Sequence, residues 1–242
     1  MRVFFRCMVV AAALSGCSAE RGWTPLDGEF QKVERNIRDG VVDGRIRQTI
    51  GDGIASLENA EKRRVCLEKF RKVILSKEEG GENNYTLLVK RVGSRVSLAD
   101  GYLDVATRCG MPFSERMEFR IAFIEWLCSE HARQTAVGIS AEDHVLGPHW
   151  TAERYLEHLD RRIYWHLERM ECAFDKSAAR ECSPEELAHL RSRLEGYFGR
   201  PLRTVVEVDR HSLEWWRKWK AWHGRYQTGR PVERPTWRDY FK

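Results

Sequence analysis

The chain has 242 residues, of which 32% are charged and 42% are hydrophobic, and its formal net charge is +5 at pH 7. This length suffices for one large domain or two small ones whose core needs no metal to hold it. Because charges of both signs are spread along the chain, the small positive excess does not indicate a nucleic-acid-binding protein, and we expect no nucleic-acid partner.

The chain begins with a segment that has the layout of a secretory signal peptide. Arg2 and Arg6 form a short cationic start, residues 3–14 are an apolar run with one thiol, and the small residues Ser15 and Gly16 precede a cleavage point. The run is shorter than the roughly 20 apolar residues that a membrane-spanning helix needs. We therefore predict that this segment directs export and is then removed.

The end of the signal, Leu14-Ser15-Gly16-Cys17, resembles the lipobox of bacterial lipoproteins. In that family the cysteine is lipidated before cleavage in front of it, which implies that Cys17 becomes the acylated first residue of the mature protein. Acyl chains would hold the protein on membrane lipid without spanning it. Ser18 stands where an Asp would indicate inner-membrane retention in enteric bacteria, which favours the outer membrane. The alternative is an ordinary secretory signal with an incidental cysteine.

A tether and three helices account for the first half of the mature chain. Residues 17–40 contain glycine and proline with few apolar side chains, which is typical of a tether. In residues 41–136 apolar side chains recur at spacings of three and four, which predicts a first helical unit. Its helices are expected over residues 44–77, 86–109 and 114–133.

Local signals indicate where these helices end. Gly51 and Gly53 lie inside the first helix and each costs about 1 kcal/mol relative to Ala, so this helix is expected to kink or to start later. Gly110, with Pro112 beyond it, ends the second helix, and Ser114 caps the third. The short connection between these two helices predicts that they are antiparallel neighbours.

A second helical unit is expected in residues 151–242, because residues 137–150 contain two glycines and a proline and show no period. Its three helices begin near Thr151, Ser183 and Arg203. The second start is the strongest local signal, with a Ser cap, Pro at the first helical position and Glu three residues after the cap. A Pro-containing tail follows the last helix.

The fold class that follows is all-α, with about six helices. No alternating strand pattern bounded by hairpin turns occurs, and the β-rich stretch at residues 204–208 also fits a helical period. Three helices in each half suggest a duplicated three-helix unit. Ile124-Glu125-Trp126-Leu127 loosely echoes Leu213-Glu214-Trp215-Trp216.

Five cysteines remain after the signal is removed and Cys17 is acylated. In an oxidising envelope they allow at most two disulfides and leave one thiol over. The first predicted bridge joins Cys172 to Cys182 across a turn between two helices, where the Cα atoms would approach the roughly 5.5 Å that a disulfide prefers.

A second bridge, predicted only if the first three helices run up, down and up, joins Cys66 to Cys128. The reference point is the lower end of the three helices, at the turn over residues 110–113. Helical rise then places Cys66 about 18 Å and Cys128 about 21 Å above that end. Cys109 lies at that lower end, beyond disulfide reach, as the odd thiol.

Motifs for catalysis and for metal binding are weak. Glu186-Leu187-Ala188-His189 is a Glu-x-x-His pair, but a helical two-metal site would need a second pair on a facing helix. His149, His158 and His166 lie near or on one helix and could meet in space, yet the ligand spacing of a zinc site is missing. Gly138-Ile139-Ser140 lacks the second glycine of a nucleophile elbow. We therefore expect no metal and no cofactor.

The unusual feature is the last predicted helix, over residues 203–226, where three tryptophans and a tyrosine recur at spacings of four, three and four. In one interpretation this aromatic face, with cations beside it, lies at a lipid headgroup layer or on a protein partner. The residues of that candidate surface are Trp215, Trp216, Trp219, Trp222, Arg217, Lys218 and Lys220. In the other interpretation the face is the core-facing side of the helix, which we favour because burying such rings contributes a few kcal/mol each. Trp216 lies at a different azimuth and is expected to remain exposed.

The sequence thus predicts a membrane-anchored envelope lipoprotein whose helical domain is an interaction or scaffold module, with membrane lipid and an envelope protein as partners. The alternative is a helical hydrolase that acts on envelope material. A pocket with converging His and Glu side chains would favour the hydrolase, whereas an exposed aromatic or basic patch would favour the module.

Overall fold

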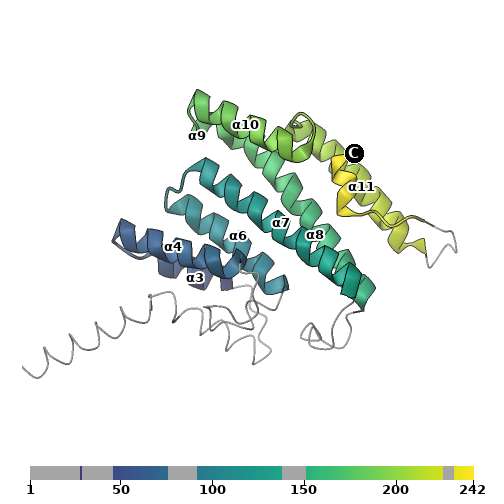
Figure 1. Cartoon of the computed structure of the whole chain (residues 1–242), viewed down its shortest axis with the longest axis horizontal. Helices are drawn as coiled ribbons and strands as arrows, with labels where there is room; N and C mark the ends of the chain where they lie inside the picture. The colour runs from purple at the N-terminus through teal and green to yellow at the C-terminus, as the bar shows by residue number, and fades with distance from the viewer. Residues whose placement is uncertain (1–27, 29–45, 76–91, 138–150, 226–231) are drawn as a thin grey trace, which may run out of the picture. The chain divides into compact units, whose positions relative to one another are not determined.

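The computed structural model describes residues 28, 46–75, 92–137, 151–225 and 232–242 of the chain (Figure 1). All regular structure in these residues is helical, which confirms the all-α prediction. The chain divides into two compact units, Met1–Cys109 and Gly110–Lys242. The predicted signal peptide and Cys17 lie outside the described residues, and each unit is considered by itself below.

The described part of unit 1 consists of α3 (Ile46–Ala55), α4 (Ala60–Leu75) and α6 (Val92–Arg108). The single helix expected over residues 44–77 is therefore wrong, since two helices occupy the described part of that range. Asn59 explains the break, because its Oδ1 accepts hydrogen bonds from the backbone N–H groups of Glu61 at 2.8 Å and Lys62 at 3.1 Å. Such a cap satisfies N–H groups that the start of a helix leaves without intrahelical partners.

Gly51 marks a close contact between α3 and α6 rather than a kink. A Cβ atom at this position would lie 2.8 Å from Cγ2 of Val105 and 2.7 Å from Nη2 of Arg108. Both distances are shorter than side chains tolerate, so any larger residue forces the two helices or the Arg108 side chain to move. The glycine that appeared to weaken the first helix is thus a packing residue.

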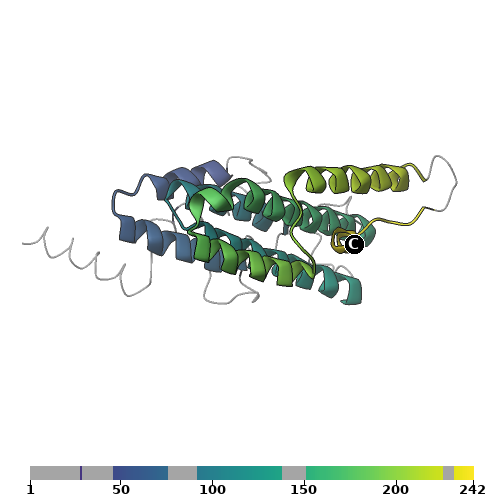
Figure 2. The same ribbon diagram turned by 90° about the horizontal axis from the view of Figure 1, so that it is seen from above.

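The described residues of unit 2 form four long helices. They are α7 (Phe113–Val137), α8 (Ala152–Ala173), α10 (Pro184–Phe198) and α11 (Val205–His223). The π-helical turn η2 (Phe174–Ala178) and α9 (Ala179–Glu181) extend α8, and the 3-10 turn η3 (Trp237–Phe241) lies near the C-terminus. α7, α11 and η3 all pack against α8. In Figure 2 the C-terminal segment turns back and runs beside α11.

The division of the chain differs from the expected one. The boundary falls between α6 and α7, not in residues 137–150, because α7 packs along α8 and belongs to the same unit. The described helices therefore do not divide into two sets of three, and the suggested duplication has no counterpart in them.

Helix ends follow the local signals in most places. Thr151 and Ser183 cap α8 and α10 as predicted, and Ser183 forms a reciprocal capping box with Glu186. Gly110, two residues after the end of α6, adopts the left-handed conformation with φ of 73°. The predicted Ser114 cap is wrong, because α7 already begins at Phe113 and Ser114 lies inside its first turn.

The predicted bridge between Cys172 and Cys182 is not formed in the structure. The segment expected to turn between them is helical, since α8 continues through η2 and α9. At about 1.5 Å of rise per residue, ten residues separate the two cysteines by roughly 15 Å, beyond the limit of about 7 Å between bridged Cα atoms. Cys66 and Cys128 belong to different units, so their pairing stays a prediction.

Candidate functional site

Three of the four tryptophans of α11 lie in the core of unit 2. The exposed fractions of Trp215, Trp219 and Trp222 are 2%, 5% and 5%. This burial confirms the core-facing interpretation and removes these three rings from the candidate interaction surface. Trp216, which lies on a different side of α11 from the other three, is half-buried.

The buried rings form a continuous stack between α11 and α8. Trp215 lies between Tyr164 of α8 and Trp219, with ring centroids 4.2 and 5.2 Å away. Its indole N–H donates to the backbone oxygen of Thr236 at 3.1 Å. The guanidinium of Arg161 lies 5.6 Å from the ring centroids of both Trp216 and Trp219. Aromatic pairs of this kind contribute about 0.5–1.5 kcal/mol each beyond the area that they bury.

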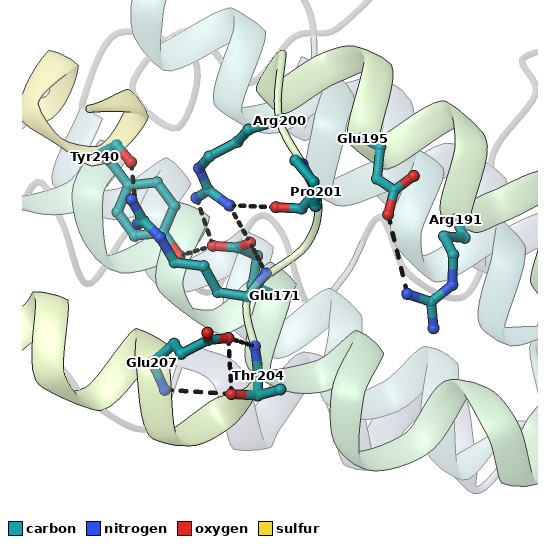
Figure 3. A network of polar contacts seen from close by, with 9 residues as sticks. Glu171, Arg191, Glu195, Arg200, Pro201, Thr204, Glu207 and Tyr240 are labelled. Atoms are coloured by element: carbon teal, nitrogen blue, oxygen red, sulfur yellow. Dashed lines mark hydrogen bonds and ion pairs between the residues drawn. The ribbon is translucent and has the colours of Figure 1, made fainter.

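A fully buried carboxylate, that of Glu171 on α8, joins three separate parts of unit 2 (Figure 3). Arg200 donates to both oxygens, with distances of 2.8 and 2.9 Å. The backbone N–H of Arg203 donates to Oε1 at 2.8 Å, and the hydroxyl of Tyr240 donates to Oε2 at 2.5 Å. Burial, reinforced by the adjacent carboxylate, raises the pKa of Tyr240. The donors therefore stay protonated and hold the charge in place.

A second fully buried carboxylate lies on the same side of α8, three turns earlier. Asp160 accepts a hydrogen bond from Arg234 at 2.6 Å and another from the backbone N–H of Trp237 at 3.2 Å. Nε2 of His131 on α7 lies 3.3 Å from Oδ1 of the same carboxylate. Asp160 thus links α7, α8 and the C-terminal segment.

These two carboxylates act as a clamp on residues 232–242, which we call the C-terminal segment. Asp160 holds its beginning and Glu171 holds Tyr240 near its end. A buried charge is tolerated only when it is paired and hydrogen-bonded, and both carboxylates meet this condition. The hydrogen bonds to the two carboxylates are therefore structural, while Nε of Arg200, Nε2 of His131 and Nε1 of Trp237 are buried with no hydrogen-bond partner among the described residues.

The sequence pattern did not single out this cluster. Asp160 and Glu171 occupy helical positions in line with the core residues Tyr164 and Leu167, at spacings of four, three and four. An acidic residue at a core position was the available signal. Its meaning was hidden because Arg234, Trp237 and Tyr240 come from a tail about 70 residues away that has no periodic pattern.

The residues considered for metal binding or catalysis are not brought together as ligands. Glu186 is engaged in the cap of α10, and both it and His189 are exposed. His158 and His166 lie two turns apart on α8, and burial, with nearby arginines, lowers their pKa values to about 4 and about 3. Among the described residues no group of three His, Cys, Asp or Glu side chains has the geometry of a metal site. His149 and Ser140 lie outside the described residues.

The side of α11 opposite the tryptophan stack carries exposed cations and apolar side chains. Leu213 is 59% exposed and Val206 is 68% exposed. At 3.6 residues per turn, three exposed cations lie in the same line along the helix. We call this line the outer stripe, and its residues are Val206, Arg210, Leu213, Arg217 and Lys220. It contains two of the predicted surface cations, whereas Lys218 lies on another side of the helix, where its charge acts on Asp239.

In comparisons with known proteins, no family model, no curated protein and no solved structure matches the chain. In the described residues, no helix has both the length and the apolar character that crossing a bilayer requires.

Proposed function

We propose that this chain is a lipid-anchored protein of the bacterial envelope, most simply of the outer membrane, and that unit 2 serves as an interaction module through α11. The anchoring part rests on the lipobox resemblance and on Cys17. The module part rests on one observation, the outer stripe, which combines exposed cations with two exposed large apolar side chains on one helix. Cations gathered on one side of a helix favour contact with an anionic partner.

The inner side of the same helix gives this surface a rigid base. The tryptophan stack and the clamp of the C-terminal segment fix α11 on α8, so the outer stripe keeps one geometry. A pre-ordered surface loses little conformational entropy when it binds. This arrangement suits an interaction or scaffold role.

The anchor is tested by replacing Cys17 with Ala and supplying cells with a labelled fatty acid. We expect the wild-type protein to carry the label and to remain in the membrane fraction after a high-salt wash. The C17A protein should carry no label and escape lipoprotein-type cleavage. A C17A protein that still carries the label would contradict the lipobox interpretation.

The module is tested in the same cells by placing a photo-crosslinking amino acid at position 213 in the outer stripe. The matched control carries it at position 180, an exposed site on α9. We expect crosslinks to an envelope component from position 213 and few from position 180. Equal yields from the two positions would contradict a role for the outer stripe.

A further inference from the structure

The outer stripe has a shape that suits a flat partner. Lys220 lies fourteen residues after Val206, which is about 21 Å along the helix axis. Because α11 is fixed on α8 by its opposite side, the line stands outward as a ridge. A ridge can touch a plane along its whole length without a complementary groove.

The charges of the stripe favour an anionic partner. Arg210, Arg217 and Lys220 are exposed, and no ion pair joins them to another residue in the part of the chain that the structure describes. Three acidic residues of α11 flank the line: Asp209 and Glu214 lie about 60–80° to either side, and Glu207, about 100° away, lies one turn before Arg210 and feels its charge. The two apolar side chains are spaced among the cations rather than collected in one place.

We infer that the outer stripe rests on the anionic headgroup layer of the membrane that anchors the protein. This inference depends on the proposed anchoring at Cys17, because the acyl group supplies the proximity. Cations lie among the phosphates of such a surface, while Val206 and Leu213 reach toward its apolar boundary. The half-buried indole of Trp216 lies beside the stripe, under the guanidinium of Arg161. Indole rings favour the boundary between water and the apolar part of a membrane, so this ring can take part in the contact.

The expected strength of this contact agrees with a role in orientation. Each Lys or Arg close to an anionic membrane favours contact by about fivefold, so three of them favour it by roughly 100-fold. That preference is too small to hold a free protein on a membrane at low concentration. It is sufficient once an anchor makes the contact intramolecular.

The inference is tested on the mature acylated protein reconstituted in vesicles of phosphatidylcholine with or without phosphatidylglycerol. A membrane-impermeant lysine-acetylating reagent is added, and the modification of each lysine is measured by mass spectrometry. Lys220 of the stripe should react at least about fivefold more slowly on the anionic vesicles than on the neutral ones. Lys218, which lies about 160° around the same helix, should react at similar rates on both.

Charge reversal provides the matched pair of variants. R210E/R217E should abolish the protection of Lys220, whereas K176E/R180E, which changes the net charge equally at exposed sites outside the stripe, should preserve it. Neither pair touches the clamp or the tryptophan stack.

Each result distinguishes this inference from the proposed function. A protein that stays on the vesicles but shows equal labelling of Lys220 on both kinds would overturn the inference and leave the anchor standing. If Lys220 is protected only after envelope proteins are added, the stripe binds a protein partner, and the inference of membrane contact is overturned as well. A protein that is not retained on vesicles would overturn the anchor and the inference together.

Discussion

Glu171 and Tyr240, 69 positions apart in the chain, are joined by a 2.5 Å hydrogen bond in which the tyrosine hydroxyl donates to a fully buried carboxylate. The bond fixes the C-terminal segment on α8 and supports the helix that presents the outer stripe. The stability of unit 2 should therefore respond strongly to changes at either end of the clamp.

Replacing Tyr240 with Phe should lower the free energy of unfolding by about 1.5–3 kcal/mol, because the variant removes a hydrogen bond to a charged group and leaves Glu171 with fewer donors. Urea-induced unfolding measures the change. Tyr197→Phe is the control, since its ring contacts Phe241 and its hydroxyl makes no hydrogen bond to another described residue. A loss in Y240F no larger than in Y197F would show that the bond contributes little.

Replacing Asp160 with Ala should destabilise unit 2 by about 3–5 kcal/mol, because Arg234 then loses its buried partner and the N–H of Trp237 loses its acceptor. The C-terminal segment should also become sensitive to limited proteolysis. Asp209→Ala removes an exposed acid from α11 and should change stability by less than about 0.5 kcal/mol. Equal protease resistance in D160A and the wild type would argue against the clamp.

Acid should destabilise the protein through His166. Burial, with Arg120, Arg162 and Arg169 nearby, lowers its pKa from 6.5 to about 3. Between those pH values the unfolded chain binds a proton that the folded chain does not. His166 therefore leaves the free energy of unfolding unchanged above pH 6.5. As the pH falls from 6.5 toward 3, this residue lowers the free energy of unfolding by up to about 1.4 kcal/mol per pH unit.

The check on His166 compares urea unfolding at neutral and mildly acidic pH. His166→Phe should lose less stability between the two conditions than the wild type, because the proton-binding group is gone. His189→Phe on the exposed side of α10 is the control and should follow the wild type. Parallel losses in H166F and the wild type would rule out this histidine as the source.

Two glycine substitutions should have opposite effects. Gly51→Ala introduces a Cβ that meets Val105 and Arg108 at under 3 Å, so overpacking should outweigh the gain in helix propensity and cost about 1–3 kcal/mol. Gly196→Ala on α10 meets no atom within 4 Å and should stabilise by about 0.5–1 kcal/mol. Thermal unfolding of the two variants measures both effects, and a shift of the same sign in both would contradict the tight contact at Gly51.

The helices could be predicted from the sequence wherever apolar periodicity and caps agreed. Ser183 with Pro184 located α10, and the spacing of Trp215, Trp219 and Trp222 located the buried side of α11. These signals act over a few residues, which is why one sequence suffices to read them.

Other features depend on contacts that no local pattern contains. The link from α8 through η2 to α9 has no helix breaker, yet it resembled a turn because its apolar pattern weakens there. The C-terminal segment has no period, so its position depends on Asp160 and Glu171. The outer stripe could be predicted only in part, because the spacing of the tryptophans places the basic residues of α11 on its solvated side but does not show that Val206 and Leu213 remain exposed there.

The clamp also has a consequence for the order in which the chain acquires its structure. During synthesis, α8 is complete long before Arg234 and Tyr240 exist, and until then two acidic side chains destined for the interior lack their partners. Burying them at that stage would leave uncompensated charge in an apolar environment. We therefore expect unit 2 to close last at its C-terminal segment, which would keep a newly made chain open during the export that we propose.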